Sequence, residues 1–324
     1  LINAGETKNV GVELTVNTVN FSTKKFSWNT TLTLSHNKNS VKALTGEAVQ
    51  LYEAKFGFNQ NTHRIAVGEP LGQFYGYITE GLYQVDDFNY DASTQTYTLK
   101  DGVPYHGDKG QIRPGMWKFK NLTGDDNVID ENDKTVIGNA QPKFYGGLNN
   151  SFTYKGFDLS IFLTFSYGNE VLNATKLVTS KVGSLNYNAL DVMNSSNRWM
   201  TINSDGQKVT DPGELAALNV GKTVAAYHDA QQGDNYIHSW AVEDASYLKL
   251  SNVTLGYTFP KNLIARVGLK NLRLYATGNN LLTWTKYSGF DPEVSTMKSG
   301  LTPGVDFGAY PLSRSFIFGL NVAF

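Results

Sequence analysis

The chain has 324 residues, and its 28 Lys and Arg nearly balance 29 Asp and Glu, which gives a formal net charge of −1. This balance argues against a nucleic-acid-binding protein, because such proteins carry a broad basic excess. The absence of cysteine excludes a disulfide framework, a thiolate metal site and a cysteine nucleophile.

Strict alternation of apolar and polar residues recurs along the chain and predicts β-strands, because successive side chains of a strand point to opposite faces. In the first such segment, Val12 and Leu14 share one face while Glu13 and Thr15 share the other. The apolar faces carry aromatic residues near the strand ends, and the opposite faces are rich in Ser, Thr, Asn and Gly. The predicted strands are 10–17, 26–35, 144–154, 157–167, 251–259, 272–280 and 315–324.

The connections between these seven strands alternate in length. Short connections cover 17–26, 155–156 and 260–271, and long ones cover 37–143, 168–246 and 282–312. Short periplasmic turns and long outer loops are typical of bacterial outer-membrane barrels, although alternation alone would also fit a soluble sandwich. Single-chain bacterial barrels have even strand numbers, so seven strands predict the C-terminal part of a larger transmembrane antiparallel β-barrel. Leu1 is not an initiator Met, which also favours an interior start.

Short stretches along the whole chain resemble the SusC/RagA-like family, the TonB-dependent outer-membrane transporters of Bacteroidetes. They follow the family's order and match the C-terminal part of its barrel. The stretches are GE at 5–6, NVGVEL at 9–14, GEPLG at 68–72, GY at 76–77, GLY at 81–83, VIGN at 136–139, PKF at 142–144, YKGFDL at 154–159, VEDASYLKL at 242–250, NVTLGY at 252–257, NNL at 279–281, GFDPE at 289–293 and YP at 310–311.

The resemblance implies an all-β fold in which residues 1–324 form the C-terminal part of one barrel domain of 22 strands. It also implies a plug domain, N-terminal strands and a TonB-contacting region, all outside this chain, and a SusD-like surface lipoprotein as a lid. The expected function is import of oligosaccharides or peptides, and the expected location is the cell outer membrane. The alternatives are a passive or structural outer-membrane barrel and a soluble glycan-binding β-sandwich.

An acidic stretch in the first long connection is similar to a calcium loop, in which oxygen ligands at alternate positions surround a hard cation. In the family this place often reads Asp-x-Asn-Gly-Asp-Gly, whereas Asn121 and Thr123 take the first positions here. The candidate calcium ligands are Asp125, Asp126, Asp130 and Asp133. The alternative is a solvated acidic turn, and no other cofactor is expected.

Catalytic patterns are missing from the sequence. The five His are scattered without an HExxH pair, and no GxSxG elbow, P-loop or Rossmann glycine pattern occurs. A catalytic triad need not be visible in sequence, so a hydrolase inside the barrel stays an open alternative. The chain is not expected to be an enzyme.

Aromatic residues in the long connections are the candidate substrate contacts, because aromatic rings stack on sugar rings and suit peptides nearly as well. The alternative for each is packing within the loops or anchoring at a membrane interface. The candidates are Trp199, Trp240, Trp284, Tyr287 and Phe290. Separately, Phe324 ends an alternating strand and resembles the signal that barrel-insertion machinery reads.

Overall fold

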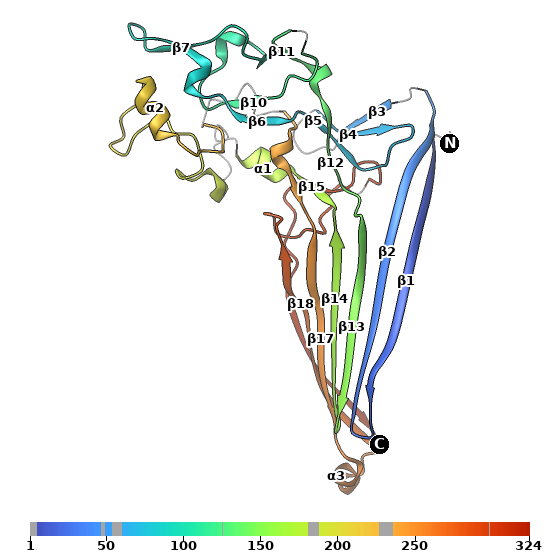
Figure 1. Cartoon of the computed structure of the whole chain (residues 1–324). Coiled ribbons are helices and arrows are strands. Elements are labelled where there is room, and N and C mark those ends of the chain that lie inside the picture. The colour runs from blue at the N-terminus through green and yellow to red at the C-terminus, as the bar shows by residue number, and fades with distance from the viewer. Residues whose placement is uncertain are drawn as a thin grey trace.

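The computed structural model describes residues 5–46, 49–53, 60–124, 126–180, 188–226, 236–297 and 299–324. One long antiparallel sheet forms the body of the molecule, and the long connections gather at one end of it (Figure 1). None of the helices in the described residues is long and apolar enough to cross a membrane.

The sheet has seven strands, and their order across the sheet is the same as their order along the chain. The strands are β1 (Gly5–Ser22), β2 (Phe26–Leu44), β13 (Phe144–Tyr154), β14 (Phe157–Tyr167), β17 (Tyr247–Thr258), β18 (Asn271–Thr285) and β20 (Ser315–Ala323). All seven predicted strands are therefore confirmed. Several are longer than predicted, because β1, β2 and β18 extend beyond the segments of strict alternation.

The pairing register places apolar side chains on one continuous face. Leu32 of β2 lies opposite Leu148 of β13, and Leu148 lies opposite Leu163 of β14. Val12 and Phe318 of the same face have exposed fractions of 69% and 81%. Within the described residues no second sheet covers this face, which argues against the sandwich alternative, because a sandwich buries its apolar faces between two sheets.

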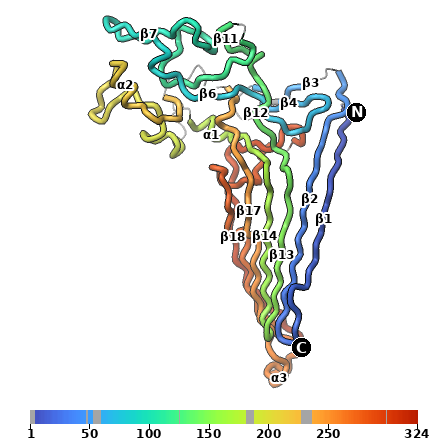
Figure 2. Tube along the Cα trace, in the orientation of Figure 1, coloured from blue at the N-terminus to red at the C-terminus, as the bar shows by residue number. Residues whose placement is uncertain are grey.

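Tight turns join the strands at the end opposite the long connections, and the C-terminus lies at the same end (Figure 2). The turn between β13 and β14 consists of Lys155 and Gly156, with φ of 47° and 93°. Positive φ at both central residues is the geometry that matches the twist of a two-residue hairpin. The turn after β17 carries the short helices α3 (Lys261–Ile264) and η6 (Ala265–Val267).

The long connections carry their own secondary structure, which the sequence did not predict. The small sheets contain β3 (Val49–Glu53), β4 (Asn61–Ala66), β5 (Gln73–Gly76) and β12 (Thr135–Asn139); β6 (Thr79–Leu82) and β10 (Trp117–Phe119); β7 (Phe88–Asp91) and β8 (Thr96–Leu99); β9 (Tyr105–His106) and β11 (Val128–Ile129); and β15 (Glu170–Asn173), β16 (Val242–Asp244) and β19 (Val305–Asp306). The helices are η1 (Val85–Asp87), η2 (Lys109–Gln111), η3 (Glu131–Asp133), α1 (Ala174–Thr179), η4 (Asp191–Met193), α2 (Pro212–Leu218) and η5 (Ser239–Ala241). Buried residues such as Phe74, Phe119 and Leu172 give these connections apolar cores of their own.

Backbone hydrogen bonds tie the three long connections to one another. The Tyr77 N–H of the first connection donates to the Ile237 carbonyl of the second at 2.9 Å. The Leu172 N–H of the second donates to the Gly304 carbonyl of the third, also at 2.9 Å. The connections therefore form one packed crown above the sheet.

Candidate functional site

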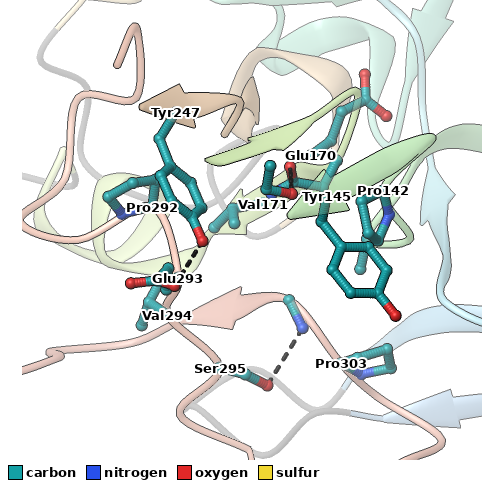
Figure 3. Close-up of a pocket in the computed structure, with 14 residues that line it drawn as sticks. Pro142, Tyr145, Glu170, Val171, Tyr247, Pro292, Glu293, Val294, Ser295 and Pro303 are labelled. Carbon is teal, nitrogen blue, oxygen red and sulfur yellow. Dashed lines mark hydrogen bonds between the residues drawn. The ribbon is translucent and has the colours of Figure 1, made fainter. Parts of the chain in front are cut away.

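A pocket of about 360 Å³, which we call the mouth pocket, lies where the crown meets the sheet (Figure 3). Tyr145, Ser166 and Tyr247 line it from the ends of β13, β14 and β17. These three residues lie opposite one another in the register and belong to the polar face. The mouth pocket therefore opens on the polar side of the sheet.

The third long connection forms the other wall of the mouth pocket through residues 292–295, which belong to the segment 289–296 that we call the strap. The Tyr247 hydroxyl donates a 2.5 Å hydrogen bond to Glu293 Oε1. Lys249, which is 4% exposed, pairs with Asp291 at 3.4 Å and also with Glu293. The stretches VEDASYLKL and GFDPE, far apart in the sequence, thus meet in space and hold the strap against the wall.

A second, more enclosed pocket of about 230 Å³ lies on the other part of the same connection. We call it the Phe290 pocket. Its lining residues come from β15 and α1, from the segment before η4, and from both limbs of the third connection. They are Asn173, Thr175, Leu190, Ser288, Gly289, Phe290, Asp306, Gly308 and Ala309.

Glu243 of β16 links the second and third connections beside this pocket. Its carboxylate accepts hydrogen bonds from the Ser288 N–H and hydroxyl, both at 2.9 Å, and pairs with Lys176 at 3.1 Å. Burial alone would raise the pKa of Glu243, but the Ser288 donors and Lys176 together outweigh it and lower that pKa. Lys176 also lies over the Trp240 ring, 4.0 Å from its centroid.

Comparison with known proteins finds relatives along the whole length of this chain. TonB-dependent receptor P3 of Formosa agariphila is 33% identical over 329 residues, which cover 99% of this chain and 29% of that protein. TonB-dependent receptor SusC of Bacteroides thetaiotaomicron is 28% identical over 99% of this chain and 27% of its own length. The chain is homologous to the SusC-type TonB-dependent receptors. It spans less than a third of the length of these relatives, and no family model matches it.

Solved structures agree on the fold of this SusC homologue. A chain of the RagAB peptide transporter matches with a TM-score of 0.68 at 21% identity, covering 99% of this chain and 30% of that chain. The 'open-open' state of the RagAB peptide importer matches with a TM-score of 0.66 at 21% identity. At this identity the likeness establishes the shared fold and leaves ligands open.

The five aromatic candidates lie in different places in the structure, and they differ in how far they are buried. Trp199 and Tyr287 are buried, with exposed fractions of 2% and 5%, and Trp240 is half-buried against the ring of Trp117. Trp284 lies opposite Leu248 on the apolar face of the sheet, a place that suits a membrane interface. Phe290, 76% exposed, borders a pocket. Substrate contact by any of the five, Trp199, Trp240, Trp284, Tyr287 and Phe290, stays a prediction.

Tyr287 contributes to the Phe290 pocket indirectly. Its hydroxyl donates a 2.6 Å hydrogen bond to Asp306 Oδ2, and Asp306 is one of the lining residues. Burial, together with the adjacent Asp306 carboxylate, raises the pKa of Tyr287, so the phenol stays protonated and fixes the carboxylate. No sequence pattern points to Asp306, which lies 19 residues from Tyr287.

In the described part of the acidic stretch the candidate carboxylates take part in hydrogen bonds, and calcium binding stays a prediction. Asp133 is buried and accepts hydrogen bonds from the backbone N–H groups of Leu122 at 2.7 Å, Thr123 at 3.0 Å and Asp130 at 2.8 Å. Burial raises the pKa of Asp133, but these donors outweigh it and lower the pKa overall. Asp126 accepts from the Val128 N–H, Asp130 accepts from the Asn132 N–H, and Asp125 lies outside the described residues. Among the described residues no cluster of His, Asp and Glu could hold a metal ion.

His63 joins the first connection to the third, beside the mouth pocket. Its Nε2 donates to the Pro303 carbonyl at 2.9 Å, and its Nδ1 accepts from the Thr62 hydroxyl at 2.8 Å. Pro303 also lines the mouth pocket. Burial lowers the pKa of His63 from 6.5 to about 4, because the Pro303 carbonyl compensates the charged form only in part.

Acid should therefore loosen this junction. When the junction opens and His63 meets water, the imidazole binds a proton between about pH 6.5 and 4, whereas the packed imidazole does not. The stabilisation of the junction by packed His63 is therefore complete above pH 6.5 and is lost towards pH 4. The junction should lose about 3 kcal/mol of stabilisation in this way. Hydrogen exchange of the amides around Gly304 measures it. In a His63→Gln control, which keeps a side-chain donor without a titrating ring, the protection factors of these amides should lose most of this pH dependence, and an unchanged dependence would contradict the assignment.

Proposed function

We propose that this chain is the C-terminal part of the barrel wall of a TonB-dependent outer-membrane transporter, which imports oligosaccharides or peptides with a SusD-like surface lipoprotein. One observation carries the proposal: a seven-stranded antiparallel sheet with one continuous apolar face belongs to a chain that is homologous to TonB-dependent receptors along its whole length. An apolar outer face and a polar inner face are what a barrel wall in lipid requires.

The open edges of the sheet support a larger barrel. In the described residues β1 and β20 each pair with one neighbour only, and they do not pair with each other. In lipid every unpaired backbone group costs several kcal/mol, so further strands must complete the wall. We propose that residues 1–324 belong to one barrel domain of 22 strands, with the plug and the TonB-contacting region elsewhere in the whole protein.

The crown indicates the orientation of the wall. Outer-membrane barrels have short turns on the periplasmic side and long loops on the cell surface. On this basis the mouth pocket faces the entry side, and a lipoprotein lid would close over the crown to keep bound substrate in place before the energised step.

Cysteine labelling of intact cells tests this orientation, and the chain offers a clean background because it has no cysteine. A membrane-impermeant maleimide should label Asn127→Cys and Ser204→Cys, which are exposed in the crown. It should miss Lys155→Cys and Asn262→Cys, which are exposed at the opposite end, until the outer membrane is permeabilised. The reverse pattern would invert the topology and remove the lid from the crown.

Uptake measurements test the function itself. Labelled oligosaccharides and peptides should enter cells that carry the whole gene, and uptake should fall to background when the gene is deleted or a protonophore removes the energy supply. A passive barrel is the second candidate, because the apolar face would suit it equally well. Uptake that depends on the gene but not on the energised inner membrane would favour the passive barrel and contradict import through TonB.

A further inference from the structure

The Phe290 pocket has the volume and the walls to hold one apolar side chain. Leu190, Phe290 and Ala309 supply apolar surface around about 230 Å³. The neighbouring Thr175 hydroxyl is already engaged, because it accepts from the Gly308 N–H at 2.8 Å and donates to the Asp306 carbonyl at 3.3 Å. A ligand hydroxyl placed beside Thr175 would give up its water without gaining a partner there, whereas an apolar group would gain by leaving water.

The Ser288 hydroxyl is engaged in the same way. It donates to Glu243 at 2.9 Å and accepts from the Asn173 side-chain amide at 3.3 Å. Asn173, which is 4% exposed, uses its side-chain oxygen to cap α1 by accepting from the Lys176 N–H at 2.9 Å. The polar groups around the pocket are thus turned towards one another rather than offered to a hydroxyl-rich ligand.

Asp306 is the exception among the lining residues. Its carboxylate is 4% exposed and accepts from the Tyr287 hydroxyl at 2.6 Å and from the Ala309 N–H at 3.2 Å. A carboxylate can accept about four hydrogen bonds, so it has acceptor capacity left. Within the described residues no Lys, Arg or His forms a salt bridge with it, whereas the nearby Glu243 pairs with Lys176. A buried carboxylate without a cation is unfavourable, and a cationic ligand group would relieve that cost.

We propose that the Phe290 pocket binds the N-terminal residue of a peptide, with the α-ammonium group at Asp306 and an apolar side chain against Leu190, Phe290 and Ala309. This inference rests on the proposed import function and narrows its substrate class to peptides. A neutral sugar has no cation to offset the charge of Asp306, and the hydroxyls around its ring would meet the apolar walls.

Calorimetric titration of the purified whole protein in detergent tests the inference with three pentapeptides: Leu-Gly-Ser-Gly-Gly, its N-acetylated form, and Ser-Gly-Ser-Gly-Gly. The free leucine peptide should bind at least about tenfold more tightly than the serine peptide, because the leucine side chain is buried. It should also bind about tenfold more tightly than the acetylated peptide, which has lost the charge-assisted bond to Asp306.

Matched variants assign the effect to the pocket. Ala309→Phe fills the cavity and should abolish the preference for leucine, while Val220→Phe, at a site that is 80% exposed in the turn after α2, should leave it unchanged. Asp306→Asn keeps an oxygen for Tyr287 and should remove only the preference for a free N-terminus. Phe290→Ala truncates an exposed ring, so it tests the wall without disturbing a core.

Equal affinity for the three peptides, including no binding of any, would overturn the inference. So would a leucine preference that survives Ala309→Phe, or maltohexaose binding that Ala309→Phe abolishes. These outcomes are separable from the import proposal, which is measured as uptake by cells. A protein that imports without the N-terminal preference refutes the pocket alone, and one that shows the preference without energised uptake refutes import alone.

Discussion

Removal of residues 322–324 should sharply reduce the amount of the whole protein in the outer membrane. Val322 and Ala323 of β20 pair with Leu272 and Asn271 of β18, and the Ala323 carbonyl also accepts from the Lys270 N–H at 2.8 Å. Their loss would leave backbone groups of β18 unpaired at the membrane, at several kcal/mol for each group. Quantitative immunoblotting of outer-membrane fractions gives the measurement.

A matched pair of substitutions separates the aromatic end from the strand pairing. Phe324→Trp keeps a ring that can lie at the interface and should assemble normally, whereas Phe324→Ala should give an intermediate level. Normal assembly of the deletion would show that neither the last pairs nor Phe324 act as an assembly signal.

Lys249→Ala should release the strap. Lys249 is buried and pairs with both Asp291 and Glu293, so its removal leaves these carboxylates without their cation. Breaking a buried pair by removal of one partner costs about 3 kcal/mol or more. Limited proteolysis of the whole protein should therefore cut within residues 289–304 much faster than in the unmodified protein.

Lys109→Ala is the control for that experiment. Lys109 pairs with Asp101 at 2.7 Å on the surface of the crown, where Asp101 is fully exposed. An exposed pair adds little to stability, so cleavage of residues 289–304 should not change. Equal cleavage rates in the Lys249 and Lys109 variants would mean that the ion pairs do not hold the strap.

Side-chain alternation predicted the sheet because it is a local property. Every strand of a barrel wall shows the same two faces, so residues such as Val12 and Glu13 reveal the strand without knowledge of its partners. The crown is different, because its strands are often two to five residues long and no period can emerge over that length. Its order comes from contacts between distant segments, such as the one from Tyr77 to Ile237.

The candidate site was predictable only in part for the same reason. Aromatic content pointed to Phe290 and Tyr287, but it also pointed to Trp199, and nothing local distinguishes a ring at a pocket from a ring in a core. Asp306 and Glu243 depend on partners 19 and 45 residues away. One signal was available: Lys249 of VEDASYLKL carries the charge opposite to that of Asp291 and Glu293 in GFDPE, and Lys249 does meet Asp291.

The two pockets share one segment of chain, which has a thermodynamic consequence. Phe290 borders the smaller pocket, and Pro292, two residues later, borders the mouth pocket. A ligand in either place contacts the strap, and a shift of the strap alters both volumes together. If a ligand in one pocket shifts the strap, the affinity of the other pocket changes, and linkage requires the factor to be the same in both directions.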